Sequence, residues 1–351
     1  MAGNGTGHLR PPDDALVRVE HLVVEFPVAH RGTVHAVSDV SIDVVRGETL
    51  GLVGESGCGK STTGRAIVQL PPPTSGSVLF DGQDLTALGR RELRAIRPNL
   101  QLIYQDPISS LNPRMTIEEI VSEPLVIWGR GTKSERRDAV ADVLEAVGLD
   151  PASSLGKRPR QFSGGQCQRI CIARALILEP QVLILDEPVS ALDVSVQAQI
   201  LNLLEEMKSR YGLTMVFIAH DLAVVRNVSD RIAVMYLGRM CEVGPNEEVF
   251  QTPAHPYTDG LLAAIPRMDA DDAGVEVKIL PGELPSPLDP PSGCRFRTRC
   301  PRAEPRCAEE VPTLRPVGRS GERYVACHFP LVDDSTRVDD VEHPSRETAV
   351  G

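Results

Sequence analysis

The residues Gly54-Glu55-Ser56-Gly57-Cys58-Gly59-Lys60-Ser61 indicate the architecture of this chain. They fit the pattern G-x-x-x-x-G-K-[ST] of a phosphate-binding loop. The apolar run 49–53 before them is expected to be a strand, and a helix is expected from Ser61 to Gln69. Backbone N–H groups of such a loop curve around phosphate oxygens, and the helix N-terminus adds partial positive charge. The sequence therefore predicts a nucleotide-binding α/β domain.

The side chains of the loop have distinct expected roles. Lys60 is expected to reach the β- and γ-phosphates, and the Ser61 hydroxyl to bind Mg²⁺. The other residues expected to surround the nucleotide phosphates are Gly54, Ser56, Gly57, Cys58, Gly59 and Thr62. The alternative, an ordinary glycine-rich turn, is disfavoured by the strand before the loop and the helix after it.

A second motif supplies acidic residues. In Leu183-Ile184-Leu185-Asp186-Glu187-Pro188 the carboxylates follow an unbroken apolar run, which is typical of a parallel strand covered on both faces. Ligands of open α/β sheets bind at the carboxyl ends of their strands. Asp186 is therefore expected to hold Mg²⁺, directly or through water, and Glu187 to polarise an attacking water. The alternative for Glu187 is a solvated loop carboxylate.

Composition limits the classes of protein to be considered. The chain has 351 residues, which suggests about two domains, and 41% of them are hydrophobic, enough for a substantial core. The net charge of −11 argues against a surface built for nucleic acid. No uncharged apolar run is long enough to cross a bilayer, and the first residues lack the apolar core of a secretory signal. We expect a soluble, cytosolic chain.

Phe162-Ser163-Gly164-Gly165-Gln166-Cys167-Gln168-Arg169 resembles the signature sequence of ABC-transporter ATPases. Further motifs follow that family's order. Gln105 resembles the Q-loop glutamine, the run 190–193 resembles the D-loop, and His220 resembles the switch histidine. Three further parts of the sequence point to one branch of this family: the stretches 105–125 and 255–266 and the terminal cysteine segment. These look like the ATP-binding subunits of bacterial oligopeptide and dipeptide importers, and the wording SLNPRMT is closer to the "F" subunit than to its "D" partner.

The resemblance implies a fold and a domain plan. The fold is an ABC-type nucleotide-binding domain, with a RecA-like core and a helical subdomain, followed by a small C-terminal cysteine-rich domain. The expected boundaries are a disordered tail over 1–15, the ATPase domain over 16–250 with its helical subdomain at about 106–178, the C-terminal domain over 251–330, and a disordered acidic tail over 331–351.

The resemblance also implies a shared active site. Two ATPase subunits pack head to tail, and each nucleotide lies between one subunit's phosphate loop and the other's signature motif. Gln105 senses magnesium, Glu187 orients water and His220 contacts the γ-phosphate. The residues expected on a nucleotide held by the partner are Ser163, Gly164 and Gly165. Gln166 and Asp193 are also expected to bind nucleotide.

Phe26 has more than one interpretation, and Cys167 departs from the family pattern. Phe26 is the expected platform for the adenine ring; the alternatives are that it is a core strand residue and that His35 takes the role. Cys167 stands where relatives usually carry Arg, which removes a cation near the signature helix without touching the expected phosphate contacts.

The C-terminal cysteines follow the spacing C-x5-C-x6-C-x19-C, at Cys294, Cys300, Cys307 and Cys327. Four thiolates can hold zinc or a [4Fe–4S] cluster, and free thiols or disulfides are the remaining alternatives. Similarity to the peptide-importer ATPases favours the cluster. The flanking arginines are expected either to neutralise such a cluster or to form a solvated basic face; they are Arg295, Arg297, Arg299 and Arg302.

These observations predict an ATP-hydrolysing subunit of a bacterial importer for di- and oligopeptides, using ATP and Mg²⁺. The implied partners are a second, D-type ATPase subunit, two transmembrane permeases that dock on the 106–125 surface, and an extracytoplasmic solute-binding protein. Nucleic acid is not among them. The expected location is the cytoplasmic face of the inner membrane. The alternatives are the same machinery carrying a nickel chelate, glutathione or an oligosaccharide, and a soluble ABC ATPase outside transport.

Overall fold

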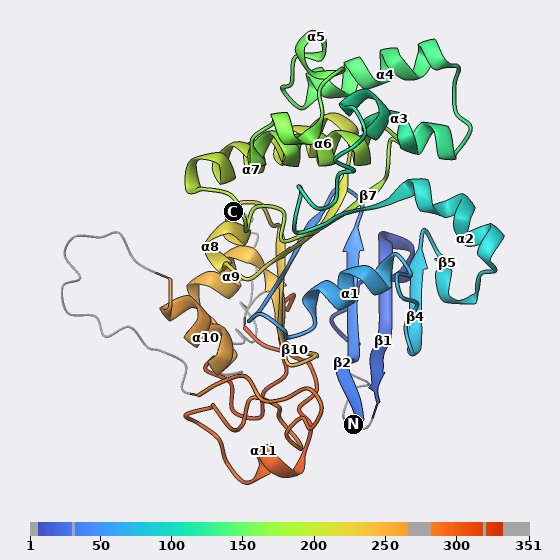
Figure 1. Cartoon of the computed structure of the whole chain (residues 1–351). Helices are drawn as coiled ribbons and strands as arrows, with labels where there is room; N and C mark the ends of the chain where they lie inside the picture. The colour runs from blue at the N-terminus through green and yellow to red at the C-terminus, as the bar shows by residue number, and fades with distance from the viewer. Residues whose placement is uncertain (1–5, 30–31, 266–281, 319–320, 333–351) are drawn as a thin grey trace, which may run out of the picture.

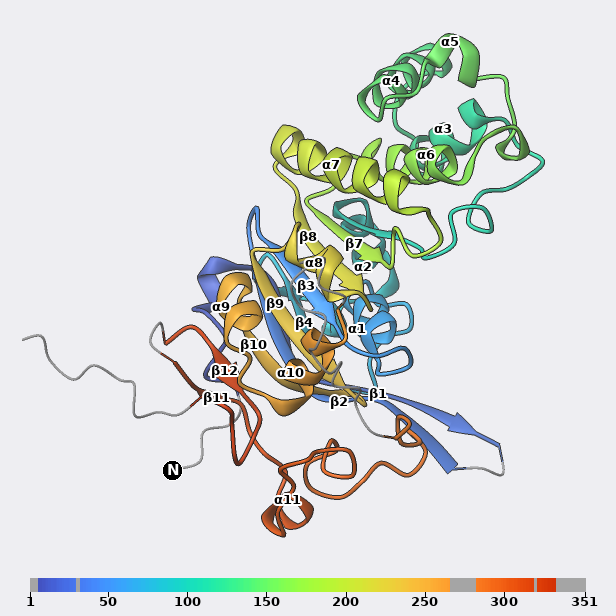
Figure 2. The same ribbon diagram turned by 90° about the vertical axis from the view of Figure 1, so that its left-hand side faces the viewer.

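The computed structural model of the chain describes residues 6–29, 32–265, 282–318 and 321–332. Two sheets and a group of helices make up the molecule (Figure 1, with a perpendicular view in Figure 2). Within the described residues, no helix is both long and apolar enough to span a membrane.

The larger sheet has the strand order β11-β12-β10-β9-β3-β8-β7-β6. Its centre is parallel, as predicted, and every residue of β3, β7 and β8 is buried. The strands are β3 (Thr49–Val53), β6 (Leu100–Ile103), β7 (Val182–Asp186), β8 (Thr214–Ala219), β9 (Arg231–Tyr236), β10 (Arg239–Pro245), β11 (Arg315–Pro316) and β12 (Tyr324–Val325).

The smaller sheet is antiparallel, in the order β2-β1-β4-β5. Its strands are β1 (Ala15–Val28), β2 (Gly32–Val45), β4 (Ser75–Phe80) and β5 (Gln83–Asp84). Helix α1 (Lys60–Ile67) packs between this sheet and the larger one, where Ala66 and Ile67 join a core made by both sheets. Since α1 begins inside the phosphate loop, this packing holds the loop against both sheets.

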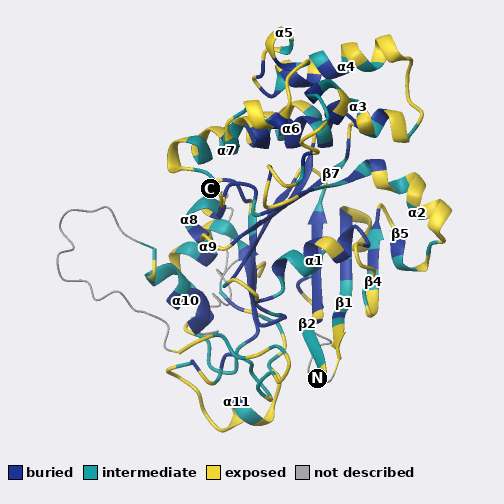
Figure 3. Ribbon diagram, in the orientation of Figure 1, coloured by how far each residue is buried: buried dark blue, intermediate teal, exposed yellow. Residues whose placement is uncertain are grey.

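Five of the helices form one group. On one side of the larger sheet lie α3 (Ile117–Ile127), α4 (Lys133–Ala146), α5 (Pro151–Ser154), α6 (Gly164–Leu176) and α7 (Val194–Tyr211). The others are α2 (Arg90–Ile96), α8 (Leu222–Arg226), α9 (Asn246–Gln251), α10 (Pro256–Ala263) and α11 (Arg306–Glu309). Figure 3 shows α3, α4 and α6 buried on the faces that meet and exposed on the outside. Alternate residues of β7 serve two cores: Leu183 and Leu185 face these helices, while Val182 and Ile184 face the α1 side.

The predicted separate cysteine-rich domain at the C-terminus is not supported. β12 pairs with β10, with Val325 opposite Glu242, so the C-terminal region extends the main sheet. Phe296 belongs to the main core and packs edge-on against Tyr236, with ring centroids 5.2 Å apart. The segment is ordered by these contacts with the main sheet and core. It lies at the end of the molecule opposite α3–α6 (Figures 1 and 2).

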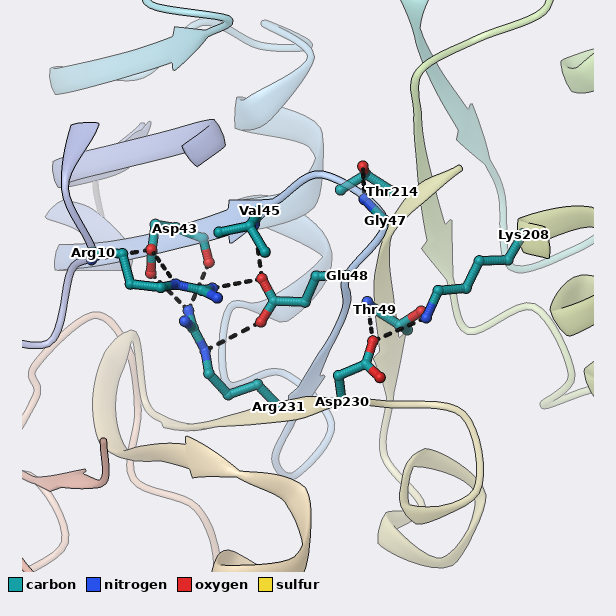
Figure 4. Close-up of polar contacts among 10 residues, drawn as sticks. All are labelled: Arg10, Asp43, Val45, Gly47, Glu48, Thr49, Lys208, Thr214, Asp230 and Arg231. Carbon is teal, nitrogen blue, oxygen red and sulfur yellow. Dashed lines mark hydrogen bonds and ion pairs between the residues drawn. The ribbon is translucent and has the colours of Figure 1, made fainter. Parts of the chain in front are cut away.

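The N-terminal segment also contacts the core. Residues 1–15 were expected to form a loose tail, yet His8 is buried and Arg10 reaches two carboxylates, those of Asp43 and Glu48 (Figure 4). The expected disordered tail 331–351 lies outside the described residues, apart from residues 331 and 332.

Candidate active site

The phosphate loop connects β3 to α1 in a conformation that requires glycine. Gly54 and Gly59 have φ angles of 151° and 107°. A Cβ on Gly54 would lie 2.1 Å from the carbonyl oxygen of Met235, and one on Gly59 would lie 2.3 Å from that of Ala36. Both contacts are with backbone that cannot move aside, so neither position accepts a side chain. The loop is therefore clamped between β9 and β2.

Lys60 turns its ammonium group back into the loop. Nζ donates hydrogen bonds to the carbonyl oxygens of Gly54, at 2.7 Å, and Glu55, at 3.0 Å. The side chain is 4% exposed. This places a positive charge inside the loop, where it can pair with a phosphate group.

The remaining loop side chains differ in exposure. Ser56 and Gly57 are exposed, and Thr62 is half-buried. Cys58 is buried in the core below the loop, and this burial raises the pKa of its thiol. The loop therefore presents Ser56 and its backbone to solvent, while Cys58 anchors it from beneath.

Ser61 and Asp186 meet at the start of α1. The Ser61 hydroxyl donates to Asp186 Oδ1 at 2.6 Å, and Arg65 Nη2 lies 3.2 Å from Oδ2 of the same carboxylate. Asp186 is 1% exposed, at the end of β7. A hydroxyl and a carboxylate are the hard oxygen ligands that Mg²⁺ prefers, so the two residues fit that ion. Arg65 was not anticipated, although its spacing of four residues from Ser61 places it on the same face of α1.

Three residues predicted to act together come together at the ends of neighbouring strands. Glu187 Oε2 accepts a hydrogen bond from Gln105 Nε2 at 3.0 Å and lies 3.2 Å from His220 Nδ1. They follow β6, β7 and β8, whose carboxyl ends lie at one edge of the sheet. Glu187 has a left-handed backbone, with φ of 50°, and its N–H donates to the carbonyl oxygen of Ile218. That backbone directs the carboxylate toward Gln105 and His220.

The signature residues are organised among themselves. Ser163 caps α6: its Oγ accepts from the Gln166 N–H at 3.3 Å, and Gln166 Oε1 accepts from the Ser163 N–H at 3.0 Å. A Cβ on Gly165 would lie 2.4 Å from Val196 of α7, which explains why this residue is glycine. Asp193 caps α7 by accepting from the Val196 N–H at 3.0 Å. Among the described residues, no hydrogen bond links these groups to the loop 54–61 of the same chain.

Phe26 lies on the β1–β2 hairpin, opposite Val34. It is 39% exposed, which rules out the alternative of a core strand residue. His35 Nδ1 lies 2.7 Å from Glu25 Oε1, so the other aromatic candidate is already paired with a carboxylate. Ala36 of the same strand approaches Gly59, so the hairpin runs beside the phosphate loop.

The prediction of a [4Fe–4S] cluster is wrong. Across the described ranges, no group of three or more His, Cys, Asp or Glu side chains could hold a metal ion, which applies equally to zinc. Cys294, Cys300, Cys307 and Cys327 are free cysteines. Burial raises the pKa of Cys294 and Cys300, and that of Cys327 to about 11, so these thiols stay protonated at neutral pH. They pack as small apolar groups around a small cavity beside Phe296.

Two of the arginines beside these cysteines contact the rest of the chain. Arg299 pairs with Glu55 of the phosphate loop, and Arg295 donates to Ser38 Oγ at 2.9 Å and to the carbonyl oxygen of Leu237. Sequence reasoning assigned no role to Glu55, and it missed both Arg299's partner and Tyr257, whose OH accepts from the Glu55 N–H. The sequence shows only that Glu55 stands at a position where the loop pattern allows any residue. That does not identify a partner 244 residues away.

Cys167 fills a buried position on α6. Its Sγ lies 3.7 Å from the carbonyl oxygen of Pro159, and the side chain is 1% exposed. The thiol therefore joins α6 to the turn before the signature motif.

Comparison with known proteins gives consistent matches. A family model described as ABC transporter matches residues 37–190, and one described as the C-terminal region of oligopeptide/dipeptide transporters matches residues 241–307. The oligopeptide transport ATP-binding protein AppF of Bacillus subtilis is 50% identical over 300 residues, which is 85% of this chain and 90% of that protein. OppF of Salmonella typhimurium, with the same printed description, is 53% identical over 284 residues, covering 80% and 85% of the two chains.

Solved structures of ABC cassettes resemble this fold as well. CbiO1 of Clostridium perfringens, part of the ABC transporter complex cbiONQ, superposes with a TM-score of 0.60 at 32% identity, covering 68% of this chain and 91% of its own. The dimeric post-hydrolysis state of the ATP-binding cassette MJ0796 with ADP and Pi also gives a TM-score of 0.60, at 30% identity, covering 66% and 98%.

Proposed function

This chain belongs to the ABC transporter ATPases, among the ATP-binding subunits of peptide importers, and we propose that its active site is the loop 54–61 with Asp186, Glu187, Gln105 and His220. The chain hydrolyses ATP to drive peptide import. The observation that carries the site assignment is the convergence of Gln105 and His220 on one oxygen of Glu187, Oε2.

The loop would hold the triphosphate. Lys60 gives up its contacts with the Gly54 and Glu55 carbonyl oxygens for the β- and γ-phosphates, and the loop amides donate to the same oxygens. Ser61, Asp186 and Gln105 would hold Mg²⁺, which when bound neutralises phosphate charge. Phe26, exposed on the hairpin beside the loop, is the platform for the adenine ring.

Glu187 acts as general base. Its carboxylate, largely shielded with a side-chain exposure of 11%, accepts the proton that the attacking water loses as that water's oxygen bonds to the γ-phosphorus. The bond from the γ-phosphorus to the β-phosphate oxygen breaks in the same displacement. His220, which is 54% exposed, swings from Glu187 to the γ-phosphate. The chain supplies position and charge rather than a covalent intermediate.

A second ATPase subunit completes the site. Ser163 caps α6, and its first turn holds Gly164, Gly165 and Gln166. Among the described residues, none of these forms a hydrogen bond with the phosphate loop of its own chain, and a helix N-terminus attracts anions. Asp193 lies at the start of α7 beside Val194, an apolar residue that is 82% exposed. We infer that these groups close over the nucleotide of a D-type partner in a head-to-tail heterodimer.

The membrane partners would bind beside Gln105. The surface 106–125 carries Ile108, which is 62% exposed, and α3 ends in the exposed pair Val126 and Ile127. A groove of about 280 Å³ between α3 and β6 adjoins this surface. We propose that two permeases dock here, that an extracytoplasmic binding protein delivers the peptide, and that the chain is peripheral on the cytoplasmic face of the membrane.

Peptide uptake tests this assignment in cells. Replacing Lys60 by Ala in the chromosomal copy removes the loop cation, and we expect uptake of a labelled oligopeptide to fall to background. Uptake of a labelled free amino acid is the control and stays unchanged. Normal oligopeptide uptake by the variant, with the protein present at its usual level, would refute the function.

A further inference from the structure

The phosphate loop is attached to the C-terminal region through Glu55. Arg299 donates to both carboxylate oxygens of Glu55, from Nη1 at 2.6 Å and from Nη2 at 3.0 Å. The Arg299 side chain is 5% exposed and the Glu55 side chain 29%. A two-pronged guanidinium–carboxylate pair fixes orientation as well as charge, and here one partner is almost fully shielded.

The backbone of Glu55 is held as well. Its N–H donates to the Tyr257 hydroxyl at 2.8 Å, and its carbonyl oxygen accepts from Lys60 Nζ at 3.0 Å. Tyr257, on α10, is fully buried and packs against Tyr236 and Phe296, with ring centroids 4.7 Å and 5.3 Å away. Three residues thus hold Glu55: Lys60 of the loop, and Tyr257 and Arg299 from the C-terminal half of the chain.

Glu55 is a carboxylate within the loop that receives a triphosphate. Unpaired, its negative charge would repel the phosphates, since like charges close together near a protein surface repel each other. The hydrogen bonds that Arg299 donates to Glu55 raise the pKa of Arg299, so the arginine stays charged at any physiological pH. The pair is therefore neutral overall, and the loop keeps its net attraction for anions.

We propose that Arg299 is a positioning residue for the phosphate loop that acts by cancelling the charge of Glu55, so that the C-terminal region sets the affinity of the site for ATP. Arg299 is assigned this role through its contact with Glu55 rather than through a contact with the nucleotide. The inference rests on the proposed binding of phosphates by the loop 54–61.

Nucleotide affinity tests the proposal in the full-length chain. Arg299→Gln should raise the Kd for ATP and the KM about tenfold, with kcat within about twofold of the wild type, because binding is weakened and the general base is intact. The Kd for adenosine should not change, since it carries no phosphate. Arg299→Lys keeps the charge and should recover most of the ATP affinity.

A second substitution separates charge from structural damage. Glu55→Gln in the Arg299→Gln background removes the repelling charge, and we expect ATP affinity to return to within about twofold of the wild type. Glu55→Gln alone should bind ATP at least as tightly as the wild type, which keeps the test decisive even where Arg299→Gln folds poorly. Arg306→Gln is the matched control, because Arg306 pairs with Glu310 on the same segment at 57% exposure.

Two results would overturn the inference: an unchanged ATP Kd in Arg299→Gln, or a double variant that binds ATP as weakly as Arg299→Gln alone. Failure of the underlying site assignment is a separate observation. It would appear as undiminished ATP binding by Lys60→Ala, whereas failure of the Arg299 inference alone leaves the Lys60→Ala loss in place.

Discussion

Glu187 combines two residue-level features that a general base requires. Its left-handed backbone and shielded side chain hold the carboxylate still, and the contacts to Gln105 and His220 both fall on Oε2. A residue held in an unusual backbone conformation costs stability and persists where the surrounding structure imposes it. The proposed function explains why this chain maintains it at the end of β7.

Glu187→Gln should separate ATP binding from ATP hydrolysis. The amide keeps the size of the side chain and cannot accept a proton, so turnover should fall by at least about 100-fold while the Kd for ATP stays within a few-fold. Phosphate release and binding of a fluorescent ATP analogue measure the two properties. Hydrolysis at the wild-type rate would remove Glu187 from the role of base.

Local motifs made the residues at the sheet edge predictable, but not the residues that support them. Lys60, Ser61 and Asp186 stand at short, fixed distances from a strand end, so the sequence alone places them together. Arg299 and Tyr257 reach Glu55 from more than two hundred residues away, and no spacing rule covers such a contact. The cysteine spacing was misleading because spacing does not reveal whether four thiols converge on a metal.

At the scale of elements, buried parallel strands were easier to predict than bulged antiparallel ones. β3 has the predicted bounds, 49–53, because a run of apolar residues buried on both faces has a clear signature. β1 and β2 were not identified: repeated register shifts interrupt the alternation that marks a half-buried strand. α3 was also not predicted as a separate helix, because Pro124 lies inside it and proline usually interrupts a helix.

Two capping boxes allow the structural and functional roles of Ser163 to be separated. Thr132 caps α4 through Glu135, in the same arrangement in which Ser163 caps α6 through Gln166. Thr132→Ala and Ser163→Ala should each lower the free energy of unfolding by about 1 kcal/mol. Only Ser163→Ala should reduce the ATPase rate, measured with the partner subunit present, since only α6 is proposed to face a nucleotide.

Urea unfolding and phosphate release measure the two effects side by side. Equal ATPase rates in the two variants, together with the expected loss of stability, would mean that Ser163 is a helix cap and nothing more.

At the scale of the whole molecule, a charged cluster joins the N-terminal segment to both sheets. Asp43 of β2 is fully buried and pairs with Arg10 at 2.9 Å and with Arg231 of β9 at 2.7 Å; Glu48, before β3, contacts the same two arginines (Figure 4). Burial opposes ionisation of Asp43, but the nearby guanidinium groups outweigh it, so the pKa of Asp43 lies below its ordinary value. The cluster fixes the turn between β2 and β3, and β3 leads directly into the phosphate loop.

Asp43→Asn should destabilise the fold in a pH-dependent way. Removing one charge from a buried group that keeps both arginines should cost about 3 kcal/mol at pH 7. Because the pKa of Asp43 is lower in the folded chain, its contribution is complete above the unfolded pKa of about 4 and is lost as pH falls through the folded value. The stability gap between wild type and variant should thus be constant from pH 7 to pH 5 and narrow below pH 4, as measured by urea unfolding at each pH.

The exposed pair of Arg46 and Asp81 provides the control for this experiment. Both side chains are more than half exposed, at 58% and 61%, so Asp81→Asn should change stability by no more than about 0.5 kcal/mol at any of these pH values. A loss of similar size in the two variants would show that the cluster around Asp43 behaves as an ordinary surface ion pair. A gap for Asp43→Asn that widens on acidification would contradict the direction of its pKa shift, because only a carboxylate with a raised pKa in the folded chain loses its contribution as pH rises.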